Sequence, residues 1–381
     1  MELEKYVADV LEDIRRRGLP AVKEYSEKFD SYRGELLVSE EELAEGVSSV
    51  PREDRQILEK VIDRVRELHQ GQVESDALQN RRGSLYGLVT RPLQRVGLYV
   101  PGGRPLPSSL IMSAVPARLA GVEELVVASP PTKGKLDPYL LFVAQALQVE
   151  EVVKLGGIQA IGALAYGCGI EKVQKIVGPG NQYVNEAKRQ VFGEVGIGRL
   201  AGPSDVCVIA DGTAPKRYVR KDLLSQLEHG EGSRAWLLTT SRDLADHCQG
   251  VGAEVQLCSD LASCVERANR IAPEHLEILT ESPSSLLEEV QNAGAVYLGI
   301  NTPVAAGDYS LGVNHVLPTG GSARFDSVLT VRDFQKVISV AQIDEEEYPE
   351  VGRLGIKMAE IEGMKAHKQS LEVRFDEEKD Q

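Results

Sequence analysis

Apolar residues recur at helical spacing near the start of the chain. Within residues 1–75, two stretches place an apolar side chain every three or four positions, which predicts amphipathic helices that bury one face. No candidate chemistry is visible in this part of the sequence. The apolar residues of the two stretches are Val7, Val10, Leu11 and Ile14, and Ile57, Val61, Val65 and Leu68.

From Val96 onward the pattern changes to short runs of β-branched and aliphatic residues that end at Gly or Pro. A longer amphipathic stretch follows each run, and this alternation is typical of βαβ units with a parallel sheet. An acidic turn, a strand and a Gly/Pro stop recur three times between residues 121 and 180. The sequence therefore predicts an α/β fold with two lobes. The predicted strands are residues 96–100, 124–128, 151–155, 174–177, 206–210, 235–239, 276–280 and 295–299.

This pattern divides the chain into four segments. We expect a helical N-terminal segment over residues 1–95 that packs on the first lobe, the first lobe over 96–205 and the second over 206–327. Strand-like runs stop beyond about Val328, so residues 328–381 are predicted to form a charged helical tail. No low-complexity linker interrupts the chain, which favours closely packed lobes.

Composition and charge narrow the class of protein. The 381 residues are 42% hydrophobic and 27% charged, as in ordinary globular proteins. A net charge of −15 would repel nucleic acid and anionic membranes alike. The five cysteines are odd in number and form no CxxC pair, which favours a reducing cytoplasm. Neither a signal peptide nor an apolar stretch of membrane-spanning length is expected.

Three Gly/Pro loops follow predicted strands, at residues 99–103, 155–159 and 177–181. Ligands of open α/β sheets bind at the carboxyl ends of the strands, and glycine lets backbone N–H groups approach a phosphate closely. The dinucleotide fingerprint is nevertheless incomplete, because Tyr183 stands where a small residue is required after Gly178 and Gly180. Nucleotide contact and plain structural turns both remain open for these loops.

Gln226 and His229 form a second candidate site at the end of a predicted helix that Gly230 stops. Residues three apart lie one turn apart on the same helical face, so the amide oxygen and the imidazole could share a metal ion. Glutamine is an uncommon zinc ligand, and a polar helix end explains the pair equally well.

Glu274 and His275 precede the predicted strand at 276–280 and form a candidate acid/base pair. A carboxylate beside an imidazole suits proton transfer near pH 7, although Pro followed by Glu also begins many ordinary turns. Candidates that also fit a structural loop or a solvated helix are Asp308, Tyr309, Asn314 and His315 of the loop 307–321, and Glu362 and His367 of the tail. His69 and His247 lie in charged helical stretches and are predicted to be on the surface.

Nine motifs in this order resemble the histidinol dehydrogenase family, and the resemblance covers roughly residues 7–374. Each motif is weak alone, but the ordered set is specific. The resemblance implies a compact member of that family, with two incomplete Rossmann-like lobes built on parallel sheets. It also implies a homodimer whose C-terminal tail reaches the partner's active site. The motifs are YVPGG, PSSLIMSAVPARLAGV, GGIQAIGALAYG, VGPGN, AGPSDV, SQLEHG, APEHLE, AGDY with NHVLPT, and EGMKAHK.

The same resemblance assigns roles to individual residues of this sequence. It implies that one zinc ion per subunit is held by Gln226, His229, Asp308 and His367, the last from the other subunit. Glu274 and His275 match the family's acid/base pair. NAD⁺ contacts match Tyr99, Gln159 and Asn181. Substrate contacts match Ser204, Gln226, His229, His275, Asp308, His315, Glu362 and His367.

The activity implied by the resemblance is a zinc-dependent, NAD-linked, four-electron oxidation of L-histidinol to L-histidine through histidinal. None of the five cysteines belongs to the groups of candidate catalytic or binding residues, in keeping with a reaction that needs no thiolate nucleophile. Oxidation of another small amino or sulfonated alcohol on the same scaffold is the alternative. A zinc hydrolase that uses Glu274 as its base, and a non-catalytic amine-binding protein, are hypotheses from other classes.

Overall fold

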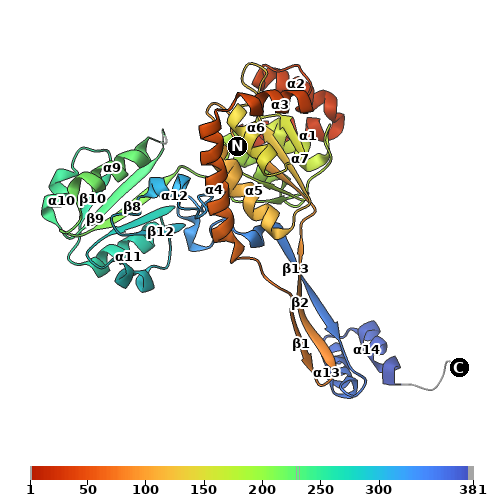
Figure 1. Cartoon of the computed structure of the whole chain (residues 1–381). Coiled ribbons are helices and arrows are strands. Elements are labelled where there is room, and N and C mark those ends of the chain that lie inside the picture. The colour runs from red at the N-terminus through yellow and green to blue at the C-terminus, as the bar shows by residue number, and fades with distance from the viewer. Residues whose placement is uncertain (1, 229, 231, 376–381) are drawn as a thin grey trace. The chain divides into compact units, whose positions relative to one another are not determined.

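The computed structural model describes residues 2–228, 230 and 232–375. The chain forms two compact units. The larger combines residues 1–73 with 92–334, and the smaller combines residues 74–91 with 335–381 (Figure 1). Among the described residues, no helix is both long and apolar enough to span a membrane.

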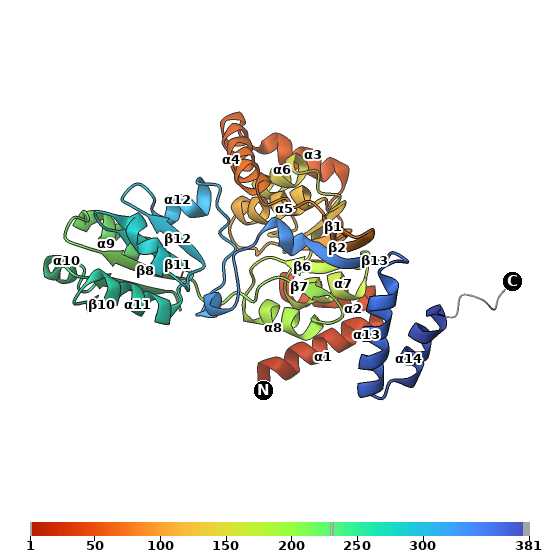
Figure 2. The same cartoon turned by 90° about the horizontal axis from the view of Figure 1, so that it is seen from below.

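The predicted N-terminal helices are confirmed. The apolar face of the first helix, α1, is buried and packs against two helices, α7 and α8, that follow strands of the first sheet (Figure 2). A hydrophobic face can leave water only against another such face, so this segment completes the core of the first lobe. The four helices are α1 (Glu2–Arg17), α2 (Leu19–Asp30), α3 (Glu40–Ser49) and α4 (Arg52–Gln70).

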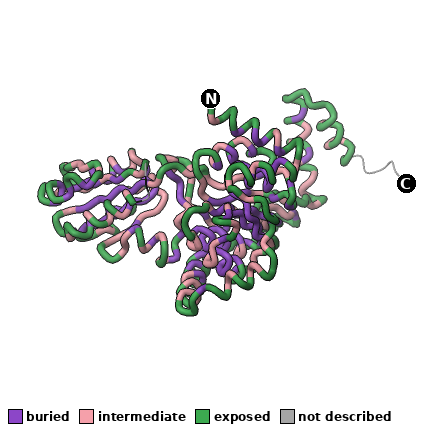
Figure 3. Tube along the Cα trace, turned by 90° about the horizontal axis from the view of Figure 1, so that it is seen from above, coloured by how far each residue is buried: buried purple, intermediate pink, exposed green. Residues whose placement is uncertain are grey.

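The first sheet has five parallel strands in the order β5-β4-β3-β6-β7. Helices cover both faces, and the strands are almost wholly buried (Figure 3). The strands are β3 (Arg95–Tyr99), β4 (Glu124–Ser129), β5 (Glu151–Lys154), β6 (Lys175–Val177) and β7 (Gly196–Ile197), and the intervening helices are α5 (Pro107–Ala120), α6 (Pro138–Ala146), α7 (Gly157–Tyr166) and α8 (Gln182–Val191).

The second sheet repeats the same order, β10-β9-β8-β11-β12, with every neighbouring pair parallel. Its two faces bury separate apolar clusters. The strands are β8 (Asp205–Ala210), β9 (Arg234–Thr239), β10 (Glu254–Leu257), β11 (His275–Leu279) and β12 (Ala295–Leu298). The helices are α9 (Lys216–Leu227), α10 (Arg242–His247), α11 (Leu261–Ile271) and α12 (Val304–Tyr309), with 3₁₀ turns η1 (Pro283–Glu289), η2 (Ser322–Arg324) and η3 (Val331–Phe334).

All eight predicted strands are present, so the two-lobe α/β prediction is confirmed. Two strands of these sheets were missed. β7 has only two residues, and β10 is a partly exposed edge strand of four residues whose sequence, EVQL, carries little apolar signal.

The smaller unit corrects two expectations. It contains a three-stranded sheet in the order β1-β2-β13, so residues 77–92 are not helical and strands do not stop at residue 328. β13 is partly or fully exposed along its whole length, and β1 is exposed throughout, so neither shows the alternation that marks a half-buried strand. The elements are β1 (Ala77–Arg81), β2 (Ser84–Pro92), β13 (Gln335–Gln342), α13 (Tyr348–Ile361), α14 (Lys365–Glu372) and η4 (Val373–Phe375).

The prediction that His69 lies on the surface is wrong. Its side chain is 1% exposed near the end of α4, where Nδ1 lies 2.9 Å from the carbonyl oxygen of Val65. Nε2 lies 3.3 Å from the amide nitrogen of Asn314, which also donates to the Met112 carbonyl. Burial lowers the pKa of His69. His69 and Asn314 therefore form an internal polar contact, whereas His247 is exposed as predicted.

Candidate active site

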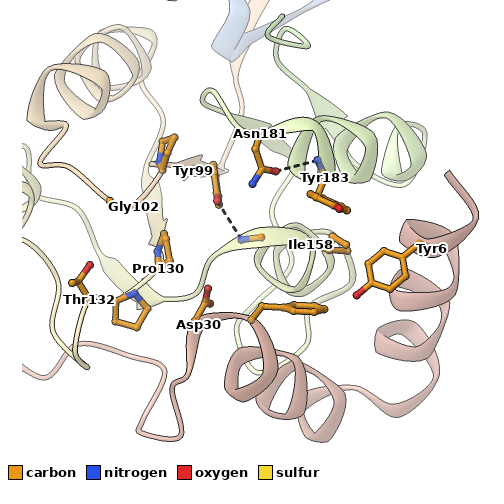
Figure 4. A pocket seen from close by; sticks show the side chains of 14 residues that line it. Tyr6, Asp30, Tyr99, Gly102, Pro130, Thr132, Ile158, Asn181 and Tyr183 are labelled. Carbon is orange, nitrogen blue, oxygen red and sulfur yellow. Dashed lines mark hydrogen bonds between the residues drawn. The ribbon is translucent and has the colours of Figure 1, made fainter. Parts of the chain in front are cut away.

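A pocket of about 750 Å³ lies at the carboxyl edge of the first sheet. The loops that follow β3, β4, β5 and β6 line it, and Tyr6, Phe29 and Tyr183 add aromatic rings (Figure 4). In this strand order, the loops after β3 and β6 flank the point where successive connections turn to opposite sides of the sheet. That switch point is where ligands of doubly wound sheets bind.

The three residues matched to NAD⁺ contacts lie in or behind this pocket. The Tyr99 hydroxyl accepts a hydrogen bond from the Gly157 N–H at 3.2 Å, and burial raises the pKa of Tyr99 to about 12. Asn181 lines the pocket and caps α8, because its side-chain oxygen accepts from the next helical N–H groups. Gln159 is fully buried, does not line the pocket, and donates to the Asp30 carboxylate at 2.9 Å.

Asp30 is a polar residue of this pocket that the sequence did not reveal. It ends α2, lines the pocket and accepts hydrogen bonds from the Gly156 N–H and from Gln159. Burial raises the pKa of its carboxyl group. No motif surrounds Asp30, so only the packing of α2 beside the sheet brings it to the ligand-binding edge.

Position 178 of the 177–181 loop requires glycine for a local structural reason. Gly178 adopts φ +122°, and a Cβ there would lie 2.0 Å from the Tyr99 carbonyl oxygen. Glycine is therefore required for the close approach of two backbones, independently of any phosphate. The loop then leads into α8, whose N-terminus favours negative charge.

A second pocket, of about 260 Å³, gathers polar residues from distant parts of the sequence. Its lining includes Ser204, Glu274, His275, Asp308 and His315, all of which the sequence singled out. Gly178 and Pro179 of the 177–181 loop belong to the same lining, so this loop contributes to both pockets. The structure thus brings together five of the predicted substrate and acid/base residues.

Glu274 is the centre of a hydrogen-bonded network. Its Oε2 accepts from the Ser204 hydroxyl at 2.5 Å and from the Asp205 N–H at 3.1 Å. The Ser204 oxygen in turn accepts from the Gln226 amide at 2.7 Å. Burial raises the pKa of Glu274 to about 8, although both hydrogen bonds favour its ionised form. A carboxyl group that titrates near neutral pH suits proton transfer.

His275 lies beside this carboxyl group. Its Nε2 is 3.7 Å from Glu274 Oε1, and its Nδ1 is 3.4 Å from the Tyr297 hydroxyl. His275 is 3% exposed and Tyr297 is 2% exposed, so protein surrounds most of the imidazole. Tyr297, on the neighbouring strand β12, was not identified from the sequence, because an aromatic residue in a strand is usually part of the core.

Two of the four expected zinc ligands lie among the described residues of the larger unit. Gln226, near the end of α9, and Asp308, in α12, line one pocket of about 160 Å³. His229 lies outside the described residues. His367 and Glu362 are exposed in the smaller unit. Among the described residues, no three His, Cys, Asp or Glu side chains are grouped to hold a metal.

The donor types nevertheless suit zinc. Gln226 and Asp308 line the same pocket and offer an amide oxygen and a carboxylate oxygen, and two imidazoles would complete an N/O set. The Gln226 amide nitrogen donates to the Ser204 hydroxyl oxygen, and the ligand-type atom of this side chain is its amide oxygen. His315 is tied to the site through its Nδ1, which lies 2.8 Å from the Asp308 carbonyl oxygen.

The position of the second pocket in its sheet differs from expectation. Ser204 immediately precedes β8, and Glu274 and His275 stand at the start of β11. Both strands therefore present their amino ends to the pocket. The rule that ligands of open α/β sheets bind at the carboxyl ends of the strands therefore predicts the position of the first pocket but not that of the second.

The chain is similar in sequence to several known proteins. A family model described as histidinol dehydrogenase matches residues 1–256 and 251–375. A curated histidinol dehydrogenase from Thermococcus kodakarensis is 60% identical over 372 residues, covering 98% of this chain and 99% of that protein. Another from Heliobacterium mobile is 43% identical over 396 residues, covering 97% and 93%.

Solved structures give the same result. A crystal structure of histidinol dehydrogenase from Elizabethkingia anophelis matches with a TM-score of 0.94 and 33% identity, covering 99% of this chain and 93% of that one. A putative aldehyde dehydrogenase from Burkholderia cenocepacia matches with a TM-score of 0.51 and 15% identity, covering 87% and 86%. The second likeness shows a shared fold alone.

Proposed function

The chain belongs to the histidinol dehydrogenase family, and we propose that it oxidises L-histidinol to histidinal and then to L-histidine, reducing two NAD⁺ at one site. The observation that carries this proposal is the pocket in which Ser204, Glu274 and His275 meet Asp308 and His315. Both oxidations remove a hydride from a carbon that bears oxygen. Each also requires a group that takes up a proton.

His275 is the proposed base of the first oxidation. Its imidazole lines the pocket, and imidazole is the side chain most often used to take up a proton near neutral pH. The Tyr297 hydroxyl near Nδ1 limits rotation of the ring, so Nε2 stays on the side of Glu274. The alcohol proton would pass to His275 as the hydride leaves the carbon.

Glu274 acts in the proposed second oxidation, in which the aldehyde reacts as its hydrate. Its carboxyl group is held by Ser204 and Asp205 and lies next to His275, so the two can share the proton taken from water. With a pKa of about 8, Glu274 is mostly protonated at pH 7, and its ionised fraction reaches one half near pH 8. The chemistry needs no thiol, and Glu274 is the group we expect to activate water.

Gln226 and Asp308, with His229 and the His367 of the partner subunit, are the proposed zinc ligands. A bound zinc ion would orient and polarise the substrate. Within this chain, Ser204 fixes the Gln226 amide and Glu274 fixes Ser204, so the ligand and the acid/base pair belong to one hydrogen-bonded network. Glu362 would hold the substrate amine or imidazole by a charge-assisted hydrogen bond.

The larger pocket is the proposed NAD⁺ site. Tyr99, Asn181 and Asp30 line it, and Gln159, behind the lining, donates a hydrogen bond to Asp30. Bound NAD⁺ accepts the hydride in each oxidation. The 177–181 loop lines both pockets, so the same segment of the chain would contact the cofactor on one side and adjoins the pocket of His275 on the other. The glycines of the loop allow close approach to its backbone.

We also propose a homodimer with shared active sites, located in the cytoplasm. Helix α13 exposes Leu354, Met358 and Ile361, which are 53% to 69% accessible and spaced so that they share one face. Such a face is typical of a protein interface. The exposure of Glu362 and His367 leaves both free to reach a partner's site. All five cysteines are free thiols, in keeping with a reducing compartment.

The proposed function is tested by counting NADH formed per L-histidinol consumed by the purified, zinc-loaded protein. Two NADH per histidinol would support the four-electron reaction. One NADH with release of aldehyde would contradict the role of Glu274 in the second step. No NADH from histidinol, with turnover of another small amino or sulfonated alcohol, would assign the scaffold to that alternative substrate.

A further inference from the structure

Two backbone segments form much of the wall of the smaller pocket. The first is residues 178–181, which lines both pockets, and the second is residues 199–204, which leads from β7 into β8 of the second sheet. We call them the wall segments. The second ends at Ser204, the hydrogen-bond partner of Glu274 and Gln226. Any movement between the wall segments would therefore displace the acid/base pair relative to the cofactor loop.

Two side chains of α8 tie the wall segments together. Asn185 donates through its amide nitrogen to the carbonyl oxygens of Gly180, at 3.0 Å, and of Ala201. Lys188, one turn later on the same helical face, donates through Nζ to Gly178 and Arg199. The two Nζ distances are 2.9 and 3.0 Å. Each side chain thus makes one hydrogen bond to each wall segment.

Lys188 is an unusual residue to find in this place. Its side chain is 0% exposed, and no ion pair involves it in the described part of the chain. Burial lowers the pKa of Lys188 to about 8. A buried ammonium group without a counter-charge loses hydration that two carbonyl oxygens only partly replace, and an apolar side chain would serve general stability better. Its retention therefore points to a local positional task.

We propose that Lys188 and Asn185 are positioning residues for hydride transfer, because they fix the cofactor-binding loop against the segment that carries Ser204. This inference rests on the proposed function, since it assumes that NAD⁺ and histidinol meet across these segments. Neither residue touches the reacting atoms. Their effect is exerted through the backbone carbonyl groups of the wall segments and, at the far end, through Ser204 on Glu274.

The expected signature is a loss of turnover rather than of binding. A displacement of about 1 Å between reacting groups lowers a rate by about 100-fold, whereas contacts with the bound ligands themselves would persist. Lys188→Met keeps the length and volume of the side chain but removes its N–H donors. It should lower kcat by about 100-fold and change both KM values by less than about threefold. The deuterium isotope effect on kcat, with histidinol labelled at the reacting carbon, should increase.

A milder variant guards against failure of Lys188→Met to fold. Asn185 is only partly buried, and Asn185→Ala removes both of its hydrogen bonds, so we expect kcat to fall by about tenfold. Lys172→Met is the matched control. Lys172 is an exposed lysine of the same lobe that pairs with Glu194 at 3.6 Å, and its replacement should leave kcat and both KM values unchanged.

Two results would overturn the proposal. In one, kcat of both variants stays within about twofold of wild type while the melting temperature falls, which would make the two residues purely structural. In the other, the whole loss appears in KM for NAD⁺, which would make them part of the cofactor site. A rise in the isotope effect together with a fall in kcat supports positioning, because hydride transfer has then become slower.

A second readout separates this inference from the proposed function. Hydrogen–deuterium exchange of zinc-loaded wild type and Lys188→Met requires no turnover. Faster exchange in both wall segments of the variant, with the remaining first sheet unchanged, supports the link between them even if wild type does not oxidise histidinol. Unchanged exchange in both wall segments would refute it. Absence of NADH formation by wild type would refute only the proposed function.

Discussion

The two five-stranded sheets share one strand order but use opposite edges. The first sheet presents the carboxyl ends of β3 to β6 to a wide pocket lined by glycines, prolines and aromatic rings. The second sheet presents the amino ends of β8 and β11 to a smaller pocket that contains Ser204, Glu274 and His275. The same topology therefore does not determine where the chemistry lies.

The difference reflects what each edge offers to a ligand. Backbone N–H groups and helix N-termini collect at the carboxyl edge of a parallel sheet, which suits the anionic backbone of a dinucleotide. Proton transfer needs titratable side chains held in partly dry surroundings, and such side chains can be placed at either edge. At the carboxyl side of the second sheet, Asp211 instead caps the loop with hydrogen bonds from Thr213 and Glu281.

The largest expected effect comes from removing the base at the amino edge. His275→Ala should lower kcat by about 1,000-fold while zinc content and NAD⁺ affinity stay at wild-type values, because His275 is not a proposed zinc ligand and the proposed NAD⁺ pocket lies at the first sheet. Steady-state kinetics with metal analysis measures both. His247→Ala changes an exposed histidine and serves as the control. Turnover within tenfold of wild type in His275→Ala would contradict its proposed role as the base.

A substitution in the C-terminal tail tests whether the pocket at the amino ends of β8 and β11 needs a second subunit. His367→Ala should lose zinc and about 100-fold in activity, because a proposed ligand is missing. In a mixed dimer of His367→Ala and His275→Ala chains, one of two sites is complete, so about half of wild-type activity should return. Co-expression with two purification tags isolates that dimer. Inactivity of a zinc-loaded mixed dimer would contradict a shared site.

A substitution of Asn181, the N-cap residue of α8, tests the proposed NAD⁺ site at the carboxyl edge of the first sheet. Asn181→Ala removes the side-chain oxygen that accepts from Tyr183 and Val184, so KM for NAD⁺ should rise by about tenfold with KM for histidinol unchanged. Asn181→Asp keeps an oxygen at the cap and separates lost helix capping from lost NAD⁺ contact. An equal rise in both KM values would show that the two edges do not act separately.

The last effect is on stability rather than on kinetics and concerns the buried carboxyl group. The pKa of Glu274 is about 8 in the folded chain and close to 4.5 when exposed, so the folded state binds more protons and its stability falls as pH rises from about 5 to 8. Glu274→Gln should flatten that pH dependence of metal-free protein by about 3.5 kcal/mol between pH 5 and 8. Urea unfolding at several pH values measures it. An identical slope in wild type and variant would contradict the raised pKa.

The sequence predicted eight of the ten strands of the two large sheets, because most of these strands are buried on both faces and read as compact apolar runs. It failed for β1 and β13, whose exposed side chains carry no such signal. His69 was wrongly predicted to be exposed, because the surrounding sequence is polar although the residue itself is buried. Its neighbours in the sequence are charged, but its own position faces Asn314 in the interior.

Site residues were predictable where a motif surrounds them and not where packing alone places them. Glu274 and His275 lie together in the chain, so the pair was visible without a structure. Asp30 and Tyr297 reach the pockets only because α2 and β12 pack beside other elements. The link from Lys188 to both wall segments was equally hidden, since its partners are backbone carbonyl groups.

The division of labour between the two edges is tested most directly by hydrogen–deuterium exchange of the zinc-loaded protein with one ligand at a time. NAD⁺ alone should protect residues 99–103, 156–159 and 177–183, and L-histidinol alone should protect residues 202–206 and 272–276. Protection of the amino-edge residues by NAD⁺ alone, with no change around residues 99–103, would contradict the assignment of the cofactor to the first sheet.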